Sequence, residues 1–137
     1  MQAIIVENSK VPIVCSYLFP GNWLALVLGK ELFQIYAITL WPFIFCRSRL
    51  DAVTKQHESI HILQAGELFV LGFYLVYLWD WLHALLKYSD SEKRQGQDLL
   101  TFAYYRIRAE QEAYTHEKTP GYLQKRKSWA WLGEYTI

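Results

Sequence analysis

The pattern of hydrophobic and polar positions divides the chain into an extended N-terminal part and a helical remainder. Residues 2–5 and 11–15 are short β-branched runs on either side of a polar stretch, which is typical of two strands or a hairpin. Residues 35–47 are dense in β-branched and aromatic residues and predict another strand, which Pro42 restricts to an edge or a bulge because proline cannot donate to a ladder. We therefore expect residues 1–48 to form strands, including an edge strand that could bind an extended peptide by strand addition.

A long helical stretch follows over residues 51–87. Asp51 is a suitable N-cap for it, and residues 68–79 carry no charge. A straight helix of this length would measure about 54 Å, whereas a compact chain of this size has a radius of gyration of about 14 Å. We therefore expect either a break at Gly66 or Gly72, which gives two packed helices, or entry of the apolar part into a bilayer.

The aromatic content favours contact with a membrane. The chain has 6 Trp and 10 Tyr residues and is 53% hydrophobic, which suits an aromatic core or a bilayer interface, where Trp and Tyr collect. The uncharged stretch is shorter than the ~20 residues of a full span, although Glu67 and Asp80 could lie at the two rims. We predict membrane association with lipid as a partner, and a cytoplasmic location is the alternative. The N-terminal residues lack a basic start followed by an apolar run, so no cleavable signal peptide is expected.

The remaining pattern completes a single predicted domain over residues 1–137. A polar loop precedes a second helix over residues 97–118, which Pro120 and the glycine after it would end, and residues 119–137 are predicted to be a packing tail. The expected fold class is α+β and mostly helical. The net charge is +1 and no basic stripe is present, so nucleic acid is not an expected partner.

The motif His-Glu-x-x-His in the first predicted helix indicates a metal site. His57 and His61 are four residues apart, so both imidazoles lie on one face of a helix, with about 6 Å between their β-carbons. Neutral imidazole is the commonest side-chain ligand of zinc, and such a pair can bind one ion. Glu58 follows His57 directly, so its carboxylate lies beside the ion, where a general base can take a proton from water. The motif therefore predicts a Zn²⁺ site with a catalytic base.

The third metal ligand is expected on the second predicted helix. Glu110 falls on the apolar stripe of this helix, and a carboxylate there is costly unless it is paired or binds a metal. Glu112 falls on the other side, where a ladder of exposed charges explains it. Glu110 is therefore the preferred ligand, with Glu112, His116 and Glu117 as alternatives. Glu117 could instead hold the free N–H of a histidine, and without a metal Glu110 would be a core carboxylate paired with an arginine.

An H-E-x-x-H motif followed by E-x-x-A on a later helix resembles the glutamate-type zincin metallopeptidases. The resemblance is greatest to the membrane-bound prenyl-protein and heat-shock proteases and to the sensor peptidases of β-lactam signalling. In that family the third ligand is the glutamate of E-x-x-A/C-D, which corresponds to residues 110–114 here. Tyr114 stands where the family has an acidic residue, so that carboxylate is missing or is supplied by Glu117. The resemblance implies a zincin-like architecture.

A larger part of the chain is similar to a group of small uncharacterised bacterial proteins. The shared order is P-F-I-F, then H-E-x-I-H-x-x-Q, an apolar aromatic run, E-x-E-A-Y-x-x-E and Y-L-x-x-R-x-x-x-A-W. It covers about residues 38–132. This resemblance implies the same zincin-like architecture, and it implies no established substrate.

These motifs predict zinc-dependent hydrolysis of a peptide bond in a peptide or protein substrate. His57, His61 and Glu110 would be the metal ligands and Glu58 the general base, while Tyr114 could donate to the developing oxyanion. Two other classes stay open. One is a metal-binding protein without hydrolytic activity, favoured by the missing acidic residue and the small size. The other is an accessory subunit of a larger membrane-embedded assembly, which the aromatic residues would suit.

Overall fold

The computed structural model describes residues 3–18, 27, 34–90 and 92–137. It is an α+β structure in which helices predominate, so the predicted fold class is confirmed at this level. In chain order the elements are β1 (Ile4–Val6), α1 (Val11–Leu18), β2 (Ala37–Leu40), β3 (Phe43–Cys46), α3 (Ala52–Glu67), α4 (Leu71–Tyr88), the short 3-10 helix η1 (Glu92–Arg94), α5 (Leu99–Tyr105), α6 (Arg108–His116), α7 (Tyr122–Lys125) and α8 (Ala130–Gly133).

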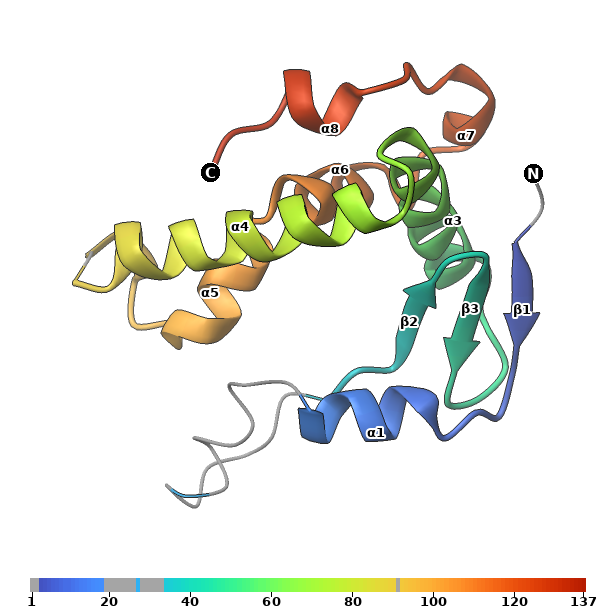
Figure 1. Ribbon diagram of the computed structural model, residues 1–137, viewed down its shortest axis with the longest axis horizontal. Coiled ribbons are helices and arrows are strands. Elements are labelled where there is room, and N and C mark those ends of the chain that lie inside the picture. Colours follow the sequence, from blue (N-terminus) through green and yellow to red (C-terminus); the bar gives the residue numbers. More distant parts are fainter. Residues whose placement is uncertain (1–2, 19–26, 28–33, 91) are drawn as a thin grey trace.

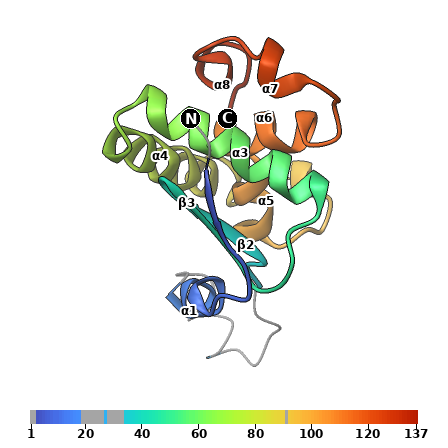
Figure 2. The ribbon, with the colours of Figure 1, turned by 90° about the vertical axis from the view of Figure 1, so that its right-hand side faces the viewer.

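The strands form a small mixed sheet in the order β1-β3-β2. β1 is parallel to β3, and β2 is antiparallel to it. α3 contacts β2, and α1 lies at the lower end of the sheet, away from the other helices (Figures 1 and 2). In the part of the chain that the structure describes, no strand pairs with the outer edge of β2.

Two predictions for residues 1–48 are wrong. Residues 11–15 begin helix α1 rather than a strand, because Pro12 sits in the first turn, where its missing N–H is tolerated, and Ser9 accepts a hydrogen bond from Val11 N–H at 3.1 Å. Residues 35–47 form a hairpin of two strands, β2 and β3, and not one strand. Pro42 lies in the turn between them, where it removes no ladder hydrogen bond.

The predicted long helix is broken into α3 and α4, which are bent by 112° relative to each other. α3 starts where predicted, since the Asp51 carboxylate accepts the N–H groups of Val53 and Thr54 at 2.9 and 3.0 Å. The break lies at Phe69 and Val70, whose φ angles are 52° and 61°, and not at either glycine. Positive φ is strained for such residues, so the sequence pattern gives no sign of this position.

The predicted helix over residues 97–118 is also two helices, α5 and α6. Ile107 interrupts it with an extended backbone, φ −61° and ψ 124°. The Ile107 side chain is completely buried, so packing of an apolar residue into the core fixes the break. The interruption changes the direction of the chain just before the turn that carries Glu110.

The core lies where α4, α5, α6 and the C-terminal segment meet. α4 crosses the molecule beside α6, while α7 and α8 run above them (Figure 1). Trp131 in α8 is fully buried and its ring packs against Phe73 with centroids 5.5 Å apart. The tail therefore packs onto the helices, as the sequence suggested for residues 119–137.

Candidate metal centre

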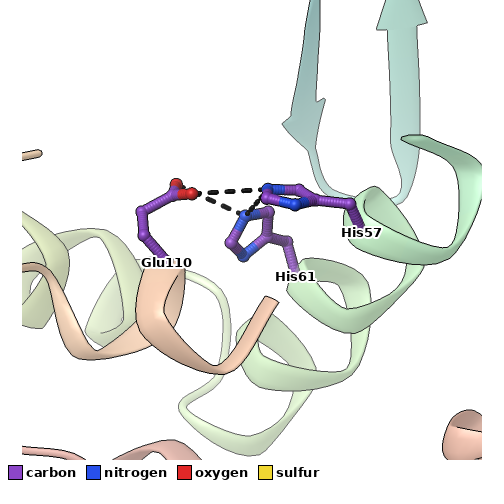
Figure 3. A group of neighbouring side chains, drawn as sticks. All are labelled: His57, His61 and Glu110. Carbon is purple, nitrogen blue, oxygen red and sulfur yellow. Dashed lines mark hydrogen bonds and ion pairs between the residues drawn. The ribbon is translucent and has the colours of Figure 1, made fainter. Parts of the chain in front are cut away.

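Two elements bring the three predicted ligands together. His57 and His61 lie one turn apart on α3, and Glu110 lies in the first turn of α6. His57 Nε2 is 3.3 Å from Glu110 Oε2, His61 Nε2 is 3.3 Å from Glu110 Oε1, and the two Nε2 atoms are 3.2 Å apart. Figure 3 shows the two rings and the carboxylate converging on one point. All three residues are buried, and their ligand atoms lie within 4.8 Å of one another.

The other nitrogen of each imidazole is held by an acceptor. His57 Nδ1 is 3.0 Å from Glu117 Oε2, and His61 Nδ1 is 2.7 Å from Gln64 Oε1. A carboxylate and an amide oxygen can only accept, so each Nδ1 donates its proton. In the neutral imidazole this leaves the lone pair on Nε2, the atom that faces the common point. Glu117 thus occupies the supporting position that the sequence allowed for it.

The charges at the centre are strongly coupled. Burial by itself lowers the pKa of His61, but the neighbouring Glu110 outweighs it and raises that pKa to about 9. Burial acts in the opposite sense on Glu110, yet the histidines hold the pKa of this carboxyl well below its usual value. Tyr77 adds a hydrogen bond to Glu110 Oε1 at 2.6 Å. Without a metal, a protonated histidine therefore supplies the positive charge that the buried carboxylate requires.

The donor set fits a zinc ion. Two imidazole nitrogens and one carboxylate oxygen are the ligands of a common class of catalytic zinc site, which keeps one position for water. Among the described residues, Glu110 Oε2 is buried and accepts no hydrogen bond; its polar contact is with His57 Nε2, 3.3 Å away. An unsatisfied buried carboxylate oxygen is costly, and a cation placed between it and the two Nε2 atoms would satisfy it. Glu110 pairs with the histidines and not with an arginine.

Glu58 lies at the same centre but makes a different contact. Its side chain is buried, and Oε2 accepts a hydrogen bond from Thr39 Oγ1 of β2 at 2.7 Å. Glu58 and the three candidate ligands line one cavity. The carboxylate is thus held beside the three ligands, between α3 and the edge strand, without belonging to the ligand cluster.

Tyr114 is the second residue for which the sequence suggested a catalytic part. Its ring packs edge-on against His57, with centroids 4.5 Å apart, and its hydroxyl lies 3.4 Å from that of Tyr104. Burial and the charge of Glu110 raise the pKa of Tyr114, although the hydrogen bond with Tyr104 opposes them. The hydroxyl therefore stays neutral and can donate a hydrogen bond at neutral pH.

The centre opens into a cavity of about 570 Å³, a volume within the range of small-molecule and cofactor sites. It is lined by the edge strand β2 with the residues before it, and by residues of α3, α4, α5 and α6. The aromatic side chains in this lining are Phe73, Tyr74, Tyr77, Tyr104, Tyr105 and Tyr114.

Two residues considered as alternative ligands, Glu112 and His116, make other contacts. Glu112, predicted to be exposed, is completely buried and is hydrogen-bonded by Arg126, because the C-terminal segment covers that side of α6. His116 stacks on Tyr122 with centroids 3.8 Å apart and lies outside the ligand cluster of the described residues. The sequence analysis gave neither Tyr77 nor Gln64 a part in the metal site. For Gln64, its position one turn after His61 on the same helix is a signal that could have found it.

Comparison with models of known protein families, with curated proteins and with solved structures found no match to this chain. Among the described helices, none alone has the length and apolar composition of a membrane span. α3 and α4 meet those criteria only when they are taken together, despite the bend between them.

Proposed function

We propose that the protein is a zincin-like, zinc-dependent peptidase in which His57, His61 and Glu110 hold the metal ion. The observation that carries this proposal is the convergence of three buried ligand atoms within 4.8 Å of one another, with the remaining nitrogen of each ring held by an acceptor. When bound, the zinc ion supplies a Lewis acid that acidifies water and polarises a carbonyl group.

Glu58 provides the base in this proposal. Its carboxylate lines the same cavity as the ligands and is oriented by the Thr39 hydroxyl at 2.7 Å. It takes a proton from the attacking water and returns it to the amine that leaves when the peptide bond breaks. Tyr114, neutral at the cavity wall, is the candidate donor to the oxyanion.

The edge of β2 is the proposed site for the substrate backbone. β2 lines the cavity and has one edge without a partner strand among the described residues, so a peptide can add to it by main-chain hydrogen bonds. Tyr74 occupies one end of this edge: its hydroxyl donates to Thr39 O at 3.1 Å and accepts from Trp41 N–H at 3.3 Å. The edge beside Ala37 is therefore the part left for a peptide.

The test compares wild-type protein with Glu58→Gln. We expect one equivalent of zinc in both proteins, measured by elemental analysis after purification without added metal. Turnover of a peptide library, followed by mass spectrometry, should fall by about 10²–10⁴-fold in Glu58→Gln. Glu134→Gln, which changes an exposed carboxylate, is the matched control and should keep full activity. Zinc binding with no turnover that depends on Glu58 would support a metal-binding protein without catalysis instead.

The outward face of α4 supports a second proposal, that the protein associates with a membrane surface. Its exposed side chains between Leu71 and Leu86 include no charged residue, and Trp79 is 65% exposed. Leucine and tryptophan on one face favour insertion into the boundary between headgroups and acyl chains. The large apolar side chains on this face are Leu71, Leu75, Leu78, Trp79, Leu82 and Leu86.

Vesicle binding tests that proposal. We expect the wild-type protein to float with liposomes of phosphatidylcholine and phosphatidylglycerol, and the double variant Leu75→Ser, Leu78→Ser to remain in the soluble fraction. Both positions are at least half exposed, so the variant should keep its zinc content. If the protein does not bind vesicles but copurifies with a membrane complex, the face contacts a protein partner and the accessory-subunit alternative gains support.

A further inference from the structure

A chain of hydrogen bonds joins His61 to the C-terminal segment. Gln64 lies between them: its Oε1 is 2.7 Å from His61 Nδ1, and its Nε2 donates to Glu112 Oε2 at 2.9 Å. Glu112 Oε1 in turn accepts from Arg126 Nε at 2.6 Å, and Arg126 Nη2 donates to Glu112 Oε2 at 3.0 Å. The chain thus runs from α3 through α6 to the residue that follows α7.

Its members are deeply buried and anchored on both sides. Gln64 and Glu112 are completely buried, and the side chain of Arg126 is 3% exposed. Arg126 also bonds Glu67, with Nη1 to Oε1 at 2.6 Å, and Tyr122 donates to Glu112 Oε1 at 2.7 Å. Hydrogen bonds in such a setting are strong and unscreened, so the orientation of each group is fixed.

The direction of the chain follows from what each group can do. Arg126 can only donate, and an ionised Glu112 can only accept. The amide nitrogen of Gln64 therefore faces Glu112, and it also donates to Ala109 O at 3.1 Å. This leaves the Gln64 oxygen toward His61, whose Nδ1 must carry the proton. The lone pair of His61 is thereby placed on Nε2, facing the metal centre.

We propose that Glu112 and Arg126 are positioning residues for the metal site, and that the C-terminal segment sets the tautomer of His61 through Gln64. His57 does not share this dependence, because its Nδ1 is held directly by Glu117. The inference rests on the proposed zinc site. It adds that the zinc affinity depends on a segment that contains no ligand.

The test uses the donor-to-acceptor direction of this chain of hydrogen bonds. In Glu112→Gln the new amide can give its oxygen to Arg126 and its nitrogen to Gln64. Gln64 then turns its own oxygen away from His61 and loses its hydrogen bond to Ala109 O. We expect zinc affinity to fall about tenfold or more. Adding Gln64→Glu to that variant restores an obligate acceptor beside His61 Nδ1 and keeps the net charge of the wild type. The double variant should recover most of the lost affinity.

Zinc affinity is measured by competition with a chromophoric chelator, and Co²⁺ substitution gives the absorption spectrum of the site. Thermal unfolding of each metal-free variant establishes that it is folded, and Glu134→Gln serves as the exposed control. If Glu112 only stabilised the fold, zinc affinity would not recover in the double variant, because the losses caused by two interior substitutions would add. Equal zinc affinity in wild type and Glu112→Gln, or no recovery, overturns this inference alone. A wild-type protein that binds no zinc overturns the proposed function.

Discussion

Asp80 is the residue whose replacement tests how the fold holds Glu110, the third proposed ligand, in place. It lies on α4, is completely buried, and forms a two-pronged ion pair with Arg108: Oδ1 to Nη2 at 2.8 Å and Oδ2 to Nε at 2.9 Å. Oδ2 also accepts the Arg108 backbone N–H at 3.2 Å. These bonds attach the first turn of α6, which carries Glu110, to α4. We predict that Asp80→Asn weakens both folding and zinc binding.

The size of the effect follows from the burial of the two partners. Removing one partner of a buried ion pair costs about 3–5 kcal/mol. The Arg108 side chain is 22% exposed, so it can turn toward water, and asparagine keeps one acceptor oxygen. The expected loss of unfolding free energy is therefore about 2–3 kcal/mol. For a chain of this length the loss corresponds to a fall in Tm of roughly 6–10 °C.

The assay is urea unfolding of the metal-free protein followed by circular dichroism, together with zinc affinity by chelator competition. Asp90→Asn, at an exposed position just after α4, is the control and should leave both quantities unchanged. We expect the zinc affinity of Asp80→Asn to fall by about tenfold, because the first turn of α6, which carries Glu110, is then less firmly positioned and its effect couples to metal binding. A stability within about 0.5 kcal/mol of wild type would refute the anchoring argument. Lower stability with unchanged zinc affinity would show that Asp80 stabilises the fold but does not position Glu110 for metal binding.

Two further predictions concern the ends of α3 and α6. Asp51→Ala should destabilise the protein by about 1 kcal/mol through loss of the N-cap. Hydrogen bonding to Thr54 lowers the pKa of Asp51, so this cap stabilises the fold at pH values above its unfolded-state pKa. The difference between variant and wild type should shrink as the pH falls below about 4, which urea unfolding at several pH values would measure. Glu117→Gln keeps an acceptor for His57 Nδ1 but removes the negative charge of the Glu117 side chain, so zinc affinity should fall about tenfold. Chelator competition measures the zinc affinity. If Glu117→Gln binds zinc as tightly as Glu134→Gln does, Glu117 does not support the metal site through His57.

The start of α3 and the histidine pair could be predicted because both depend on local geometry. Asp51 reaches N–H groups two and three residues ahead of it, and His57 and His61 are brought together by the helical repeat alone. Glu110 followed from one general rule, that a carboxylate on an apolar face needs a partner. No contact between distant segments had to be known for these steps.

The break at Phe69 and Val70 could not be predicted in this way. Glycines flank it at positions 66 and 72 and made a break there the natural expectation, whereas residues 68–71 are uniformly apolar and give no turn signal. Phe69 and Val70 nevertheless adopt a backbone that is unfavourable for them. Gly72 contributes indirectly, because a Cβ there would lie 3.2 Å from Leu68 Cβ. Packing of α4 against α5 and α6 outweighs the local preference, so tertiary contacts determine this position.

Glu112 shows why its own placement on α6 could not be predicted from the sequence. On a helical wheel the charge of Glu112 predicts an exposed position. In the folded protein it is covered by Arg126, which lies 14 residues further along the chain in the C-terminal segment. A buried carboxylate with a buried arginine is weak evidence for stability, since apolar residues often stabilise such a position better. Its interior position, one amide away from His61, therefore fits the orienting role proposed for it better than a stabilising role. The same argument distinguishes Glu112 from Glu110. Each carboxylate of α6 is buried, but Glu112 is fully satisfied by protein donors, whereas Glu110 keeps one oxygen without a hydrogen bond from the described residues, so Glu110 is the one that a cation would complete.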